Sequence, residues 1–307
     1  MVGPETRIVK GLEDLESREA GNRESTVSRK LPCRPGGAQY TCESRPGQRR
    51  KWRARSAVHF PRMADAAATT APTAPPLDKS GQTIRDMFAG VAPRYDLLNH
   101  VLSASLDYVW RGRAAAAIYA PAASPVLDLC CGTGDQATAL KRRGARVAAA
   151  DFCIPMLALA RRKFVRLPSP RPGALAADAL ALPFPAGHFQ GATVSFGLRN
   201  VADLDAALRQ LAGVLRPGGK LVVLECAIPR WQPLRGLYLF YFLRLLPWIG
   251  RLISPEGSAY SYLPNSVLSF PQRQAFLDRM AAAGFADRAW EELSGGTVCI
   301  YQGRIPA

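Results

Sequence analysis

The fold is decided by Val126-Leu127-Asp128-Leu129-Cys130-Cys131-Gly132-Thr133-Gly134-Asp135, a stretch near the middle of the 307-residue sequence. Its first four residues predict a buried strand that contains one acid, Asp128. Gly132 and Gly134 allow the backbone to turn sharply and to pass close to a ligand. Residues 135–143 then predict a helix, with Gly144 as its C-terminal stop. A strand, a glycine loop and a helix form the first half of a nucleotide-binding βαβ unit.

The residues around this loop indicate which kind of nucleotide it binds. A second apolar strand, 145–150, ends in Asp151, about 20 residues after the loop, where an acid hydrogen-bonds the ribose hydroxyls of a nucleoside. A dinucleotide site needs a third glycine, but Ala137 stands there, and the acids beside the loop would repel a diphosphate. An acidic glycine loop suits a cationic nucleoside. We therefore predict an S-adenosylmethionine site that includes Asp128, Gly132, Gly134 and Asp151.

Composition allows one large domain or two small ones with a substantial core, because 48% of the residues are hydrophobic. The formal net charge of +16 suggests nucleic acid or an anionic membrane as a partner. Residues 1–62 hold 14 Lys and Arg against 7 Asp and Glu, and residues 63–307 carry the rest of the excess without a long basic block. We interpret the charge of this main part as a solvated basic surface and predict no nucleic-acid partner.

The first 80 residues differ in composition from the rest. Residues 1–62 are rich in Arg, Glu, Gly, Ser and Pro and lack apolar periodicity, which predicts disorder. They contain no signal-peptide run, and their acids are atypical of a transit peptide. Our hypothesis is that Met63 is the true start and that the preceding residues come from an over-long gene prediction. Residues 63–80 predict a flexible leader, and residues 81–307 the catalytic domain.

The sequence contains seven cysteines, an odd number. No C-x-x-C motif or histidine pairing predicts a zinc site, so we expect no bound metal. Cys130 and Cys131 are adjacent, which is unfavourable for a mutual disulfide. We interpret all seven as reduced thiols of an intracellular protein.

Periodicity elsewhere predicts the rest of an α/β domain. Residues 81–111 predict an N-terminal helical cap, in which aromatic and polar side chains alternate with aliphatic ones. Beyond Asp151 we predict helices at 154–164, 203–215 and 271–283, and strands at 174–177, 191–196, 220–224, 289–293 and 297–303. Composition predicts a turn at 216–219 and a loop at 260–266. Seven strands with interleaved helices imply one doubly wound sheet.

Two strand ends carry further candidate ligands. Asp178 and Ala179 follow the third predicted strand, where an acid can accept a hydrogen bond from an adenine amine; a solvated loop acid is the alternative. Residues 195–200 lie at the carboxyl end of the fourth strand, where ligands bind in open α/β sheets.

Residues 234–253 are strongly apolar and aromatic. Arg244, Pro247 and Arg251 interrupt them and argue against a transmembrane span. A basic aromatic helix can lie on a membrane surface or line the site of a lipid-like substrate. A helix buried against the sheet is the alternative.

With these residues in view, the chain resembles the UbiE/MenG-type quinone-biosynthesis C-methyltransferases from about Phe88 to Gly303. The most specific stretches are Tyr95-Asp96-x-x-Asn99 with Ser103 and Trp110, and Phe196-Gly197-Leu198-Arg199-Asn200-Val201. The glycine loop, Leu215-Arg216-Pro217-Gly218-Gly219 through Glu225, Tyr260-x-Tyr262-Leu263-Pro264-x-Ser266 and Leu293-Ser294-Gly295-Gly296 add to the match.

This resemblance implies a class I, Rossmann-like S-adenosylmethionine-dependent methyltransferase that works in menaquinone or ubiquinone biosynthesis. It implies that the substrate is a demethylmenaquinol or a related polyprenyl benzoquinol. From the reduced cysteines and the basic aromatic segment at 234–253 we predict a cytoplasmic protein that contacts the inner membrane surface. The resemblance assigns cofactor binding to Thr133, Asp151, Asp178, Ala179 and Ser195. The family usually has a histidine three residues before the tryptophan of its first motif, and this chain has Asp107 there.

The reaction itself suggests candidate catalytic residues. A hydroquinone carbon next to an oxygen becomes nucleophilic when the phenol loses its proton, and it then attacks the sulfonium methyl in line. The protein must position ring and methyl and supply a base. We predict Asp107 and His100 as base or relay, Arg199 as a stabiliser of phenolate charge and Asn200 as an orienting group. The alternatives are an N-cap role for Asp107, an exposed helix position for His100 and a structural salt bridge for Arg199.

Three other functions are alternatives to the methylation of a quinol. A methyltransferase for another small molecule would not need the quinone-family stretches, which are present. A nucleic-acid methyltransferase acting on amines would carry Asn/Asp-Pro-Pro-Tyr after the fourth strand, where this chain has Phe196-Gly197-Leu198-Arg199. A non-catalytic scaffold of the same fold would not need the glycine loop with Asp128 and Asp151. The sequence does not indicate whether the protein is a monomer or an oligomer.

Overall fold

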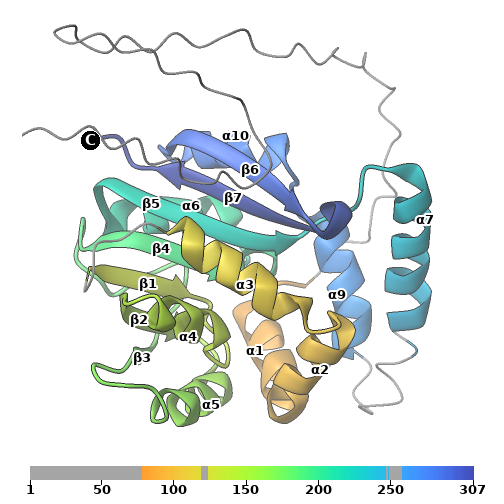
Figure 1. Cartoon of the computed structure of the whole chain (residues 1–307), viewed down its shortest axis with the longest axis horizontal. Coiled ribbons are helices and arrows are strands. Elements are labelled where there is room, and N and C mark those ends of the chain that lie inside the picture. Colours follow the sequence, from red (N-terminus) through yellow and green to blue (C-terminus); the bar gives the residue numbers. More distant parts are fainter. Residues whose placement is uncertain (1–77, 119–123, 247, 249–257) are drawn as a thin grey trace, which may run out of the picture. The chain divides into compact units, whose positions relative to one another are not determined.

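The computed structural model describes residues 78–118, 124–246, 248 and 258–307 (Figure 1). The predictions for residues 1–62, and for most of the leader at 63–80, therefore lie outside the described residues. The same holds for the end of the apolar segment at 234–253, of which 247 and 249–253 are not described.

Seven strands form one sheet in the order β3-β2-β1-β4-β5-β7-β6. Strands β1 to β5 pair in parallel, whereas β7 is antiparallel to both β5 and β6. The strands are β1 Pro125–Leu129, β2 Arg146–Asp151, β3 Gly173–Ala176, β4 Phe189–Ser195, β5 Leu215–Cys226, β6 Ala286–Leu293 and β7 Val298–Arg304. The predicted doubly wound, seven-stranded sheet is confirmed.

Helices cover both faces of this sheet because its strand residues alternate between two cores. Leu127 and Leu129 of β1 face one core, which also holds Leu208 and Phe276 from helices on that side. Val126 faces the other core, to which three different helices contribute. The first pair of helices is α6 Leu204–Val214 and α10 Gln274–Ala282, and the other three are α3 Leu106–Ala117, α4 Asp135–Arg142 and α5 Ile154–Phe164.

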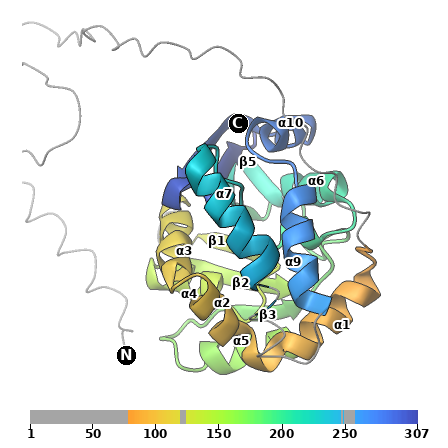
Figure 2. The same ribbon diagram turned by 90° about the vertical axis from the view of Figure 1, so that its right-hand side faces the viewer.

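The remaining helices cover the carboxyl ends of the parallel strands, as the views in Figures 1 and 2 show. Figure 2 shows α7 and α9 side by side across this end, with α1 and α2 beneath them. These elements are α1 Gly81–Val91, α2 Tyr95–Leu102, α7 Gln232–Phe240, the π-helical turn η5 Tyr241–Leu245 and α9 Ser258–Ser269, together with three short 3-10 turns, η3 Ala92–Arg94, η4 Leu198–Asn200 and η6 Ser294–Gly296. The predicted N-terminal helical cap is thus confirmed.

Two apolar clusters hold the cap in place. Val91 and Ala92 pack against Cys153 and Met156 at the start of α5. Leu98 of α2 packs with Phe242 and Leu246 of the segment after α7 and with Val267 of α9. The cap is therefore fixed both to the loop after β2 and to the helices above the sheet.

The structure corrects two local predictions. Residues 260–266, expected as a loop, lie inside α9, and Pro264 is within that helix. The burial of Val267 against the cap outweighs the hydrogen bond that the proline removes. Residues 216–219, expected as a turn, belong to β5 as a bulge, since the register with β4 jumps from Leu215 to Lys220.

The glycine loop gives a direct test of this packing. The backbone of Gly134 has φ +86°, and an added Cβ would lie 2.6 Å from the Phe164 ring. We expect Gly134→Ala to lower the free energy of unfolding by at least about 2 kcal/mol, measured by urea denaturation. Gly112→Ala is the control, because its added Cβ meets nothing within 4 Å; a helical alanine there stabilises by up to about 1 kcal/mol. Equal stability of Gly134→Ala and the wild type would contradict this account.

Candidate active site

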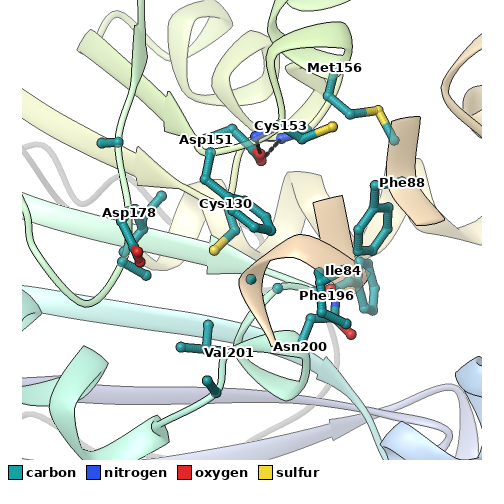
Figure 3. Close-up of a pocket in the computed structure, with 18 of the residues that line it drawn as sticks. Ile84, Phe88, Cys130, Asp151, Cys153, Met156, Asp178, Phe196, Asn200 and Val201 are labelled. Carbon is teal, nitrogen blue, oxygen red and sulfur yellow. Dashed lines mark hydrogen bonds between the residues drawn. The ribbon is translucent and has the colours of Figure 1, made fainter. Parts of the chain in front are cut away.

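A first cavity, of about 150 Å³, lies where β1, β2 and β4 end beneath helix α1. Because loops at the carboxyl ends of parallel strands meet at one edge, side chains distant in sequence converge there. The residues labelled in Figure 3 are Ile84, Phe88, Cys130, Asp151, Cys153, Met156, Asp178, Phe196, Asn200 and Val201.

Asp151 joins two loops of this cavity. One carboxylate oxygen accepts the backbone N–H of Gly132 at 2.8 Å, and the other accepts the backbone N–H of Cys153 at 2.8 Å (Figure 3). Burial raises the pKa of the Asp151 carboxyl, and these two hydrogen bonds oppose the rise. The acid predicted at the end of the second strand thus orders the glycine loop and lies in the cavity wall.

Four other predicted ligands also lie in this wall, namely Gly132, Asp178, Ala179 and Ser195. Asp178 accepts the backbone N–H of Leu180 at 2.9 Å, which fixes the turn after β3. The Ser195 hydroxyl is buried, and within the described part of the chain it has no hydrogen-bond partner. A buried polar group without a partner is costly, so this hydroxyl is a candidate to bind a polar ligand.

Asp128, Thr133 and Gly134 do not line this cavity. Asp128 is fully buried within β1 and accepts a hydrogen bond from the Thr193 hydroxyl at 3.0 Å. Burial raises the pKa of the Asp128 carboxyl to about 7, although the bond from Thr193 opposes the rise. The predicted direct cofactor contacts of these three residues remain predictions.

The Thr133 hydroxyl takes part in an ionic network that ties the cap to the glycine loop. It hydrogen-bonds Asp96 of α2. The ammonium group of Lys163 lies 2.7 Å from a carboxylate oxygen of Asp96 and 2.6 Å from one of Asp135. Nothing in the sequence around Lys163, which lies in α5, had indicated that it takes part in this network.

A second, larger cavity of about 420 Å³ lies under α2, α3, α7 and α9. Most of its lining side chains are aliphatic or aromatic, among them Leu98, Leu102, Trp110, Tyr238, Tyr241 and Phe242. Four residues line both cavities, namely Phe88, Tyr95, Phe196 and Asn200. The two cavities are therefore neighbours that share a wall.

Two predicted catalytic residues meet at the edge of this larger cavity. Nδ1 of His100 lies 3.0 Å from a carboxylate oxygen of Asp107, and its Nε2 lies 2.9 Å from the Tyr108 hydroxyl. Asp107 lines the cavity and also accepts the Ser103 hydroxyl at 2.9 Å. Tyr108 is 54% exposed, so the chain of contacts runs from the cavity to solvent.

Arg199 and Asn200 also line the larger cavity. Nη1 of Arg199 donates to Glu225 at 2.8 Å and to the carbonyl of Phe196 at 2.7 Å. Burial lowers the pKa of the Arg199 guanidinium, but the Glu225 carboxylate outweighs this and the pKa is raised. The structural salt bridge, stated above as an alternative, is present, and it leaves less of this charge available to a substrate.

One group of side chains has the composition of a metal site. His100, Asp107 and Asp135 offer ligand atoms within 4.8 Å of one another. However, Lys163 already pairs with Asp135, and Arg111 lies 3.8 Å from Asp107. We interpret the group as part of an ion-pair network.

Two further residues of this region were missed from the sequence, Tyr108 and Arg111. Asp107 and Arg111 are spaced i, i+4, which places them on one face of a helix and was a usable signal. The stacking of Tyr108 on His100 depends on how α2 and α3 cross, and no spacing reveals that.

Comparison with known proteins identifies the family of this chain. Residues 77–304 match the model of the ubiE/COQ5 methyltransferase family. The chain belongs to this family. It is 49% identical over 228 residues to a demethylmenaquinone methyltransferase of Thermus thermophilus, a match that covers 72% of this chain and all of that protein. It is 42% identical over 233 residues to a ubiquinone/menaquinone biosynthesis C-methyltransferase of Geobacter sulfurreducens, covering 74% of this chain and 90% of that protein.

Solved structures with low sequence identity share the fold. The [4+2]-cyclase SpnF superposes with a TM-score of 0.54 at 18% identity, covering 74% of this chain and 97% of its own. A methyltransferase of Thermotoga maritima gives a TM-score of 0.52 at 17% identity, covering 72% of this chain and 99% of its own. The class I methyltransferase fold is thus established, and family and fold imply S-adenosylmethionine as cofactor. No helix among the described residues is long and apolar enough to cross a bilayer.

The buried acid of β1 predicts a pH dependence of stability. The pKa of Asp128 rises from 3.8 to about 7 on folding, so the folded state holds this proton more tightly than the unfolded chain. Stability is therefore lost as pH rises from about 4 to about 7. We expect Asp128→Asn to reduce this loss, measured by urea denaturation at about pH 5 and about pH 8. The exposed Asp287→Asn is the control, and an unchanged pH slope in Asp128→Asn would contradict the prediction.

Proposed function

We propose that the protein transfers the methyl group of S-adenosylmethionine to a ring carbon of a polyprenyl hydroquinone, converting a demethylmenaquinol to a menaquinol. Membership of the ubiE/COQ5 methyltransferase family supports the reaction class. The names of the similar proteins from Thermus and Geobacter support the choice of a quinol. The 49% identity to the Thermus protein, whose name specifies menaquinone, favours a naphthoquinol over a benzoquinol.

The observation that carries this proposal is the shared wall of the two cavities. The smaller cavity carries, within a mostly apolar lining, the acid and hydroxyl groups that a nucleoside needs. The larger cavity, lined mostly by aliphatic and aromatic side chains, adjoins it at Phe88, Tyr95, Phe196 and Asn200. Transfer between two bound molecules requires their reacting atoms to meet at such a boundary. A lipid-like aromatic ring with an isoprenoid tail suits the aromatic lining of the larger cavity.

The residues of the smaller cavity suit S-adenosylmethionine. The buried, unpartnered Ser195 hydroxyl offers a hydrogen bond to the cofactor, and Asp151 lies at the strand end where a ribose binds. Asp178 and Ala179 lie where the adenine ring would rest. When bound, the cofactor supplies an electrophilic methyl group on a sulfonium centre.

Asp107 is the candidate general base for the hydroquinone. It is the carboxylate in the wall of the larger cavity, and it holds His100 at 3.0 Å. A proton accepted by Asp107 would pass through His100 and the exposed Tyr108 hydroxyl to solvent. Asn200 lies at the shared wall and would orient the ring.

Helix α7 and the turn η5 are the candidate route for the lipid tail. Tyr238, Tyr241 and Phe242 line the larger cavity, while Leu237 and Phe240 are 67% and 63% exposed. Between Glu225 and Glu256 the sequence contains no acid, and it contains the basic residues Arg230, Arg235, Arg244 and Arg251. An exposed apolar face with basic flanks favours an anionic membrane surface, and we propose that the protein collects its substrate there.

Methyl transfer to defined quinols tests the proposal. Purified protein is incubated with labelled S-adenosylmethionine and either a demethylmenaquinol or a demethylated methoxy-benzoquinol in detergent. We expect label on the naphthoquinol, because the similarity to named menaquinone enzymes is the greater. Label on both would widen the substrate range, whereas bound cofactor without label on either quinol would refute the quinol assignment.

The membrane route has its own test. Leu237→Glu with Phe240→Glu adds two negative charges to the exposed face of α7. We expect a loss of about tenfold or more in activity on substrate in anionic vesicles, since each buried apolar side chain contributes about 1.5–3 kcal/mol. Activity on a short-tailed, water-soluble quinol should be retained. Val165→Glu, a 62% exposed aliphatic at the end of α5, is the matched control; equal vesicle activity of both variants would reject the route.

A further inference from the structure

The larger cavity contains a second guanidinium, that of Arg111, to which the proposed reaction assigns no role. Arg111 lies in α3, its side chain is 9% exposed, and it lines the cavity. Its guanidinium carbon lies 5.3 Å from the centre of the Phe196 ring. Because Phe196 lies in the wall shared with the cofactor cavity, this charge is close to the proposed site of transfer.

Arg111 and Arg199 differ in how many of their hydrogen-bond donors already have an acceptor within the protein. Arg199 donates to Glu225 and to the Phe196 carbonyl. The Nε atoms of both arginines are buried and have no hydrogen-bond acceptor among the described residues. However, no nitrogen of Arg111 donates a hydrogen bond within the described part of the chain, whereas Nη1 of Arg199 donates two. Its nearest acid, Asp107, is 3.8 Å away, beyond hydrogen-bonding distance, and binds His100 and Ser103 instead.

A buried, charged donor without an acceptor is costly, so a ligand oxygen at this place would restore the lost interaction. A guanidinium prefers a planar, anionic oxygen partner. The ring of Phe196 holds the guanidinium through a cation–π contact without using its donors. The cavity therefore offers a fixed positive charge with free donors next to a carboxylate.

We propose that Arg111 is a catalytic residue that binds the hydroquinone oxygen next to the acceptor carbon as a phenolate. This inference rests on the proposed function and names the group that activates the ring. It transfers to Arg111 the charge-stabilising role that the sequence had suggested for Arg199, which Glu225 largely neutralises.

The groups described above account for each proton and each bond in the proposed methyl transfer. Asp107 takes the phenol proton, and the phenolate oxygen binds Arg111. The ring carbon beside that oxygen forms a bond to the methyl group as the carbon–sulfur bond breaks, and the electron pair stays on sulfur. The newly substituted ring carbon then loses its proton, which restores the aromatic phenolate. The phenolate oxygen takes one proton back, so that of the two protons removed one is released to solvent through His100 and Tyr108.

Other charged groups that face Arg111 set the conditions of the test. They are His100 from α2, Asp107 from α3, Asp128 from β1, and the Arg199–Glu225 pair with Cys226 beside it. Burial raises the pKa of the Cys226 thiol to about 11, so it stays protonated near neutral pH. Of the cations among these groups, Arg111 is the one without a hydrogen-bonded acid.

The test compares Arg111→Met with Arg111→Lys and with Arg113→Met. Arg113 lies on the same helix, is exposed and pairs with Glu291, so its variant is the matched control. The first readout is the kcat/KM for a demethylmenaquinol, which we expect to fall by about 100-fold or more in Arg111→Met. Arg111→Lys keeps the charge and should retain part of the rate. Calorimetric binding of S-adenosylhomocysteine should stay within about threefold of the wild type, since Arg111 does not line the cofactor cavity.

The second readout does not depend on turnover. The probe 1-naphthol changes its absorption when it ionises, and it is titrated in complex with each variant and S-adenosylhomocysteine. We expect its apparent pKa in the wild type and in Arg113→Met to lie at least about one unit below that in Arg111→Met, because a nearby cation favours the phenolate.

The outcomes separate this inference from the proposed function. If the wild type methylates the quinol and Arg111→Met keeps both the rate and the naphthol pKa, the inference fails and the function stands. If the wild type methylates no quinol but the naphthol pKa depends on Arg111, the quinol assignment fails and the phenolate site stands. A rate loss in Arg111→Met without a pKa change of the probe also overturns the inference, since it reports a structural role.

Discussion

The carboxylate of Asp151 joins the loop that follows β1 to the loop that follows β2, and the smaller cavity lies around this junction. It accepts the backbone N–H groups of Gly132 and Cys153, one on each oxygen. The same loop supplies Cys153, against which Val91 of the cap packs. The shape of the glycine loop and the position of the N-terminal helices therefore depend on one buried acid.

Phe196 connects this cavity to the second one. Its backbone has φ +60°, a conformation that a bulky residue adopts only when its surroundings hold it there. The backbone N–H donates to the carbonyl of Leu224 at 2.7 Å, and the ring meets Trp110 edge-on and the guanidinium of Arg111. The strained backbone at the end of β4 thus brings the Phe196 ring and the Arg111 guanidinium together at the wall that the two cavities share. In the proposed reaction, the methyl donor and the aromatic acceptor would meet there.

Most of the fold could be predicted from sequence because local periodicity determines it. The helix at 154–164 matches its predicted bounds, and each predicted strand has its counterpart in the sheet. Helix α9 could not be predicted, since its proline and polar residues indicate a loop and its packing on Leu98 and Phe242 involves residues far away in the sequence. Contacts between residues far apart in the sequence could not be predicted either. Lys163, for example, forms an ion pair with Asp96, which lies 67 positions earlier in the sequence. For the same reason, the sequence placed Arg199 in the site but gave no sign that Glu225 neutralises it.

The site therefore consists of two adjoining cavities covered by the same helical cap. The smaller one carries acid and hydroxyl groups, and the larger one is lined mostly by aliphatic and aromatic side chains. The measurement that tests this most directly is a crystal structure of the protein with S-adenosylhomocysteine and a short-tailed menaquinol. The account predicts the ribose at Asp151, the sulfur at the wall formed by Tyr95, Phe196 and Asn200, and the quinol ring on the far side of that wall, in the larger cavity. A sulfur atom pointing away from the larger cavity, or a quinol bound outside it, would contradict the account.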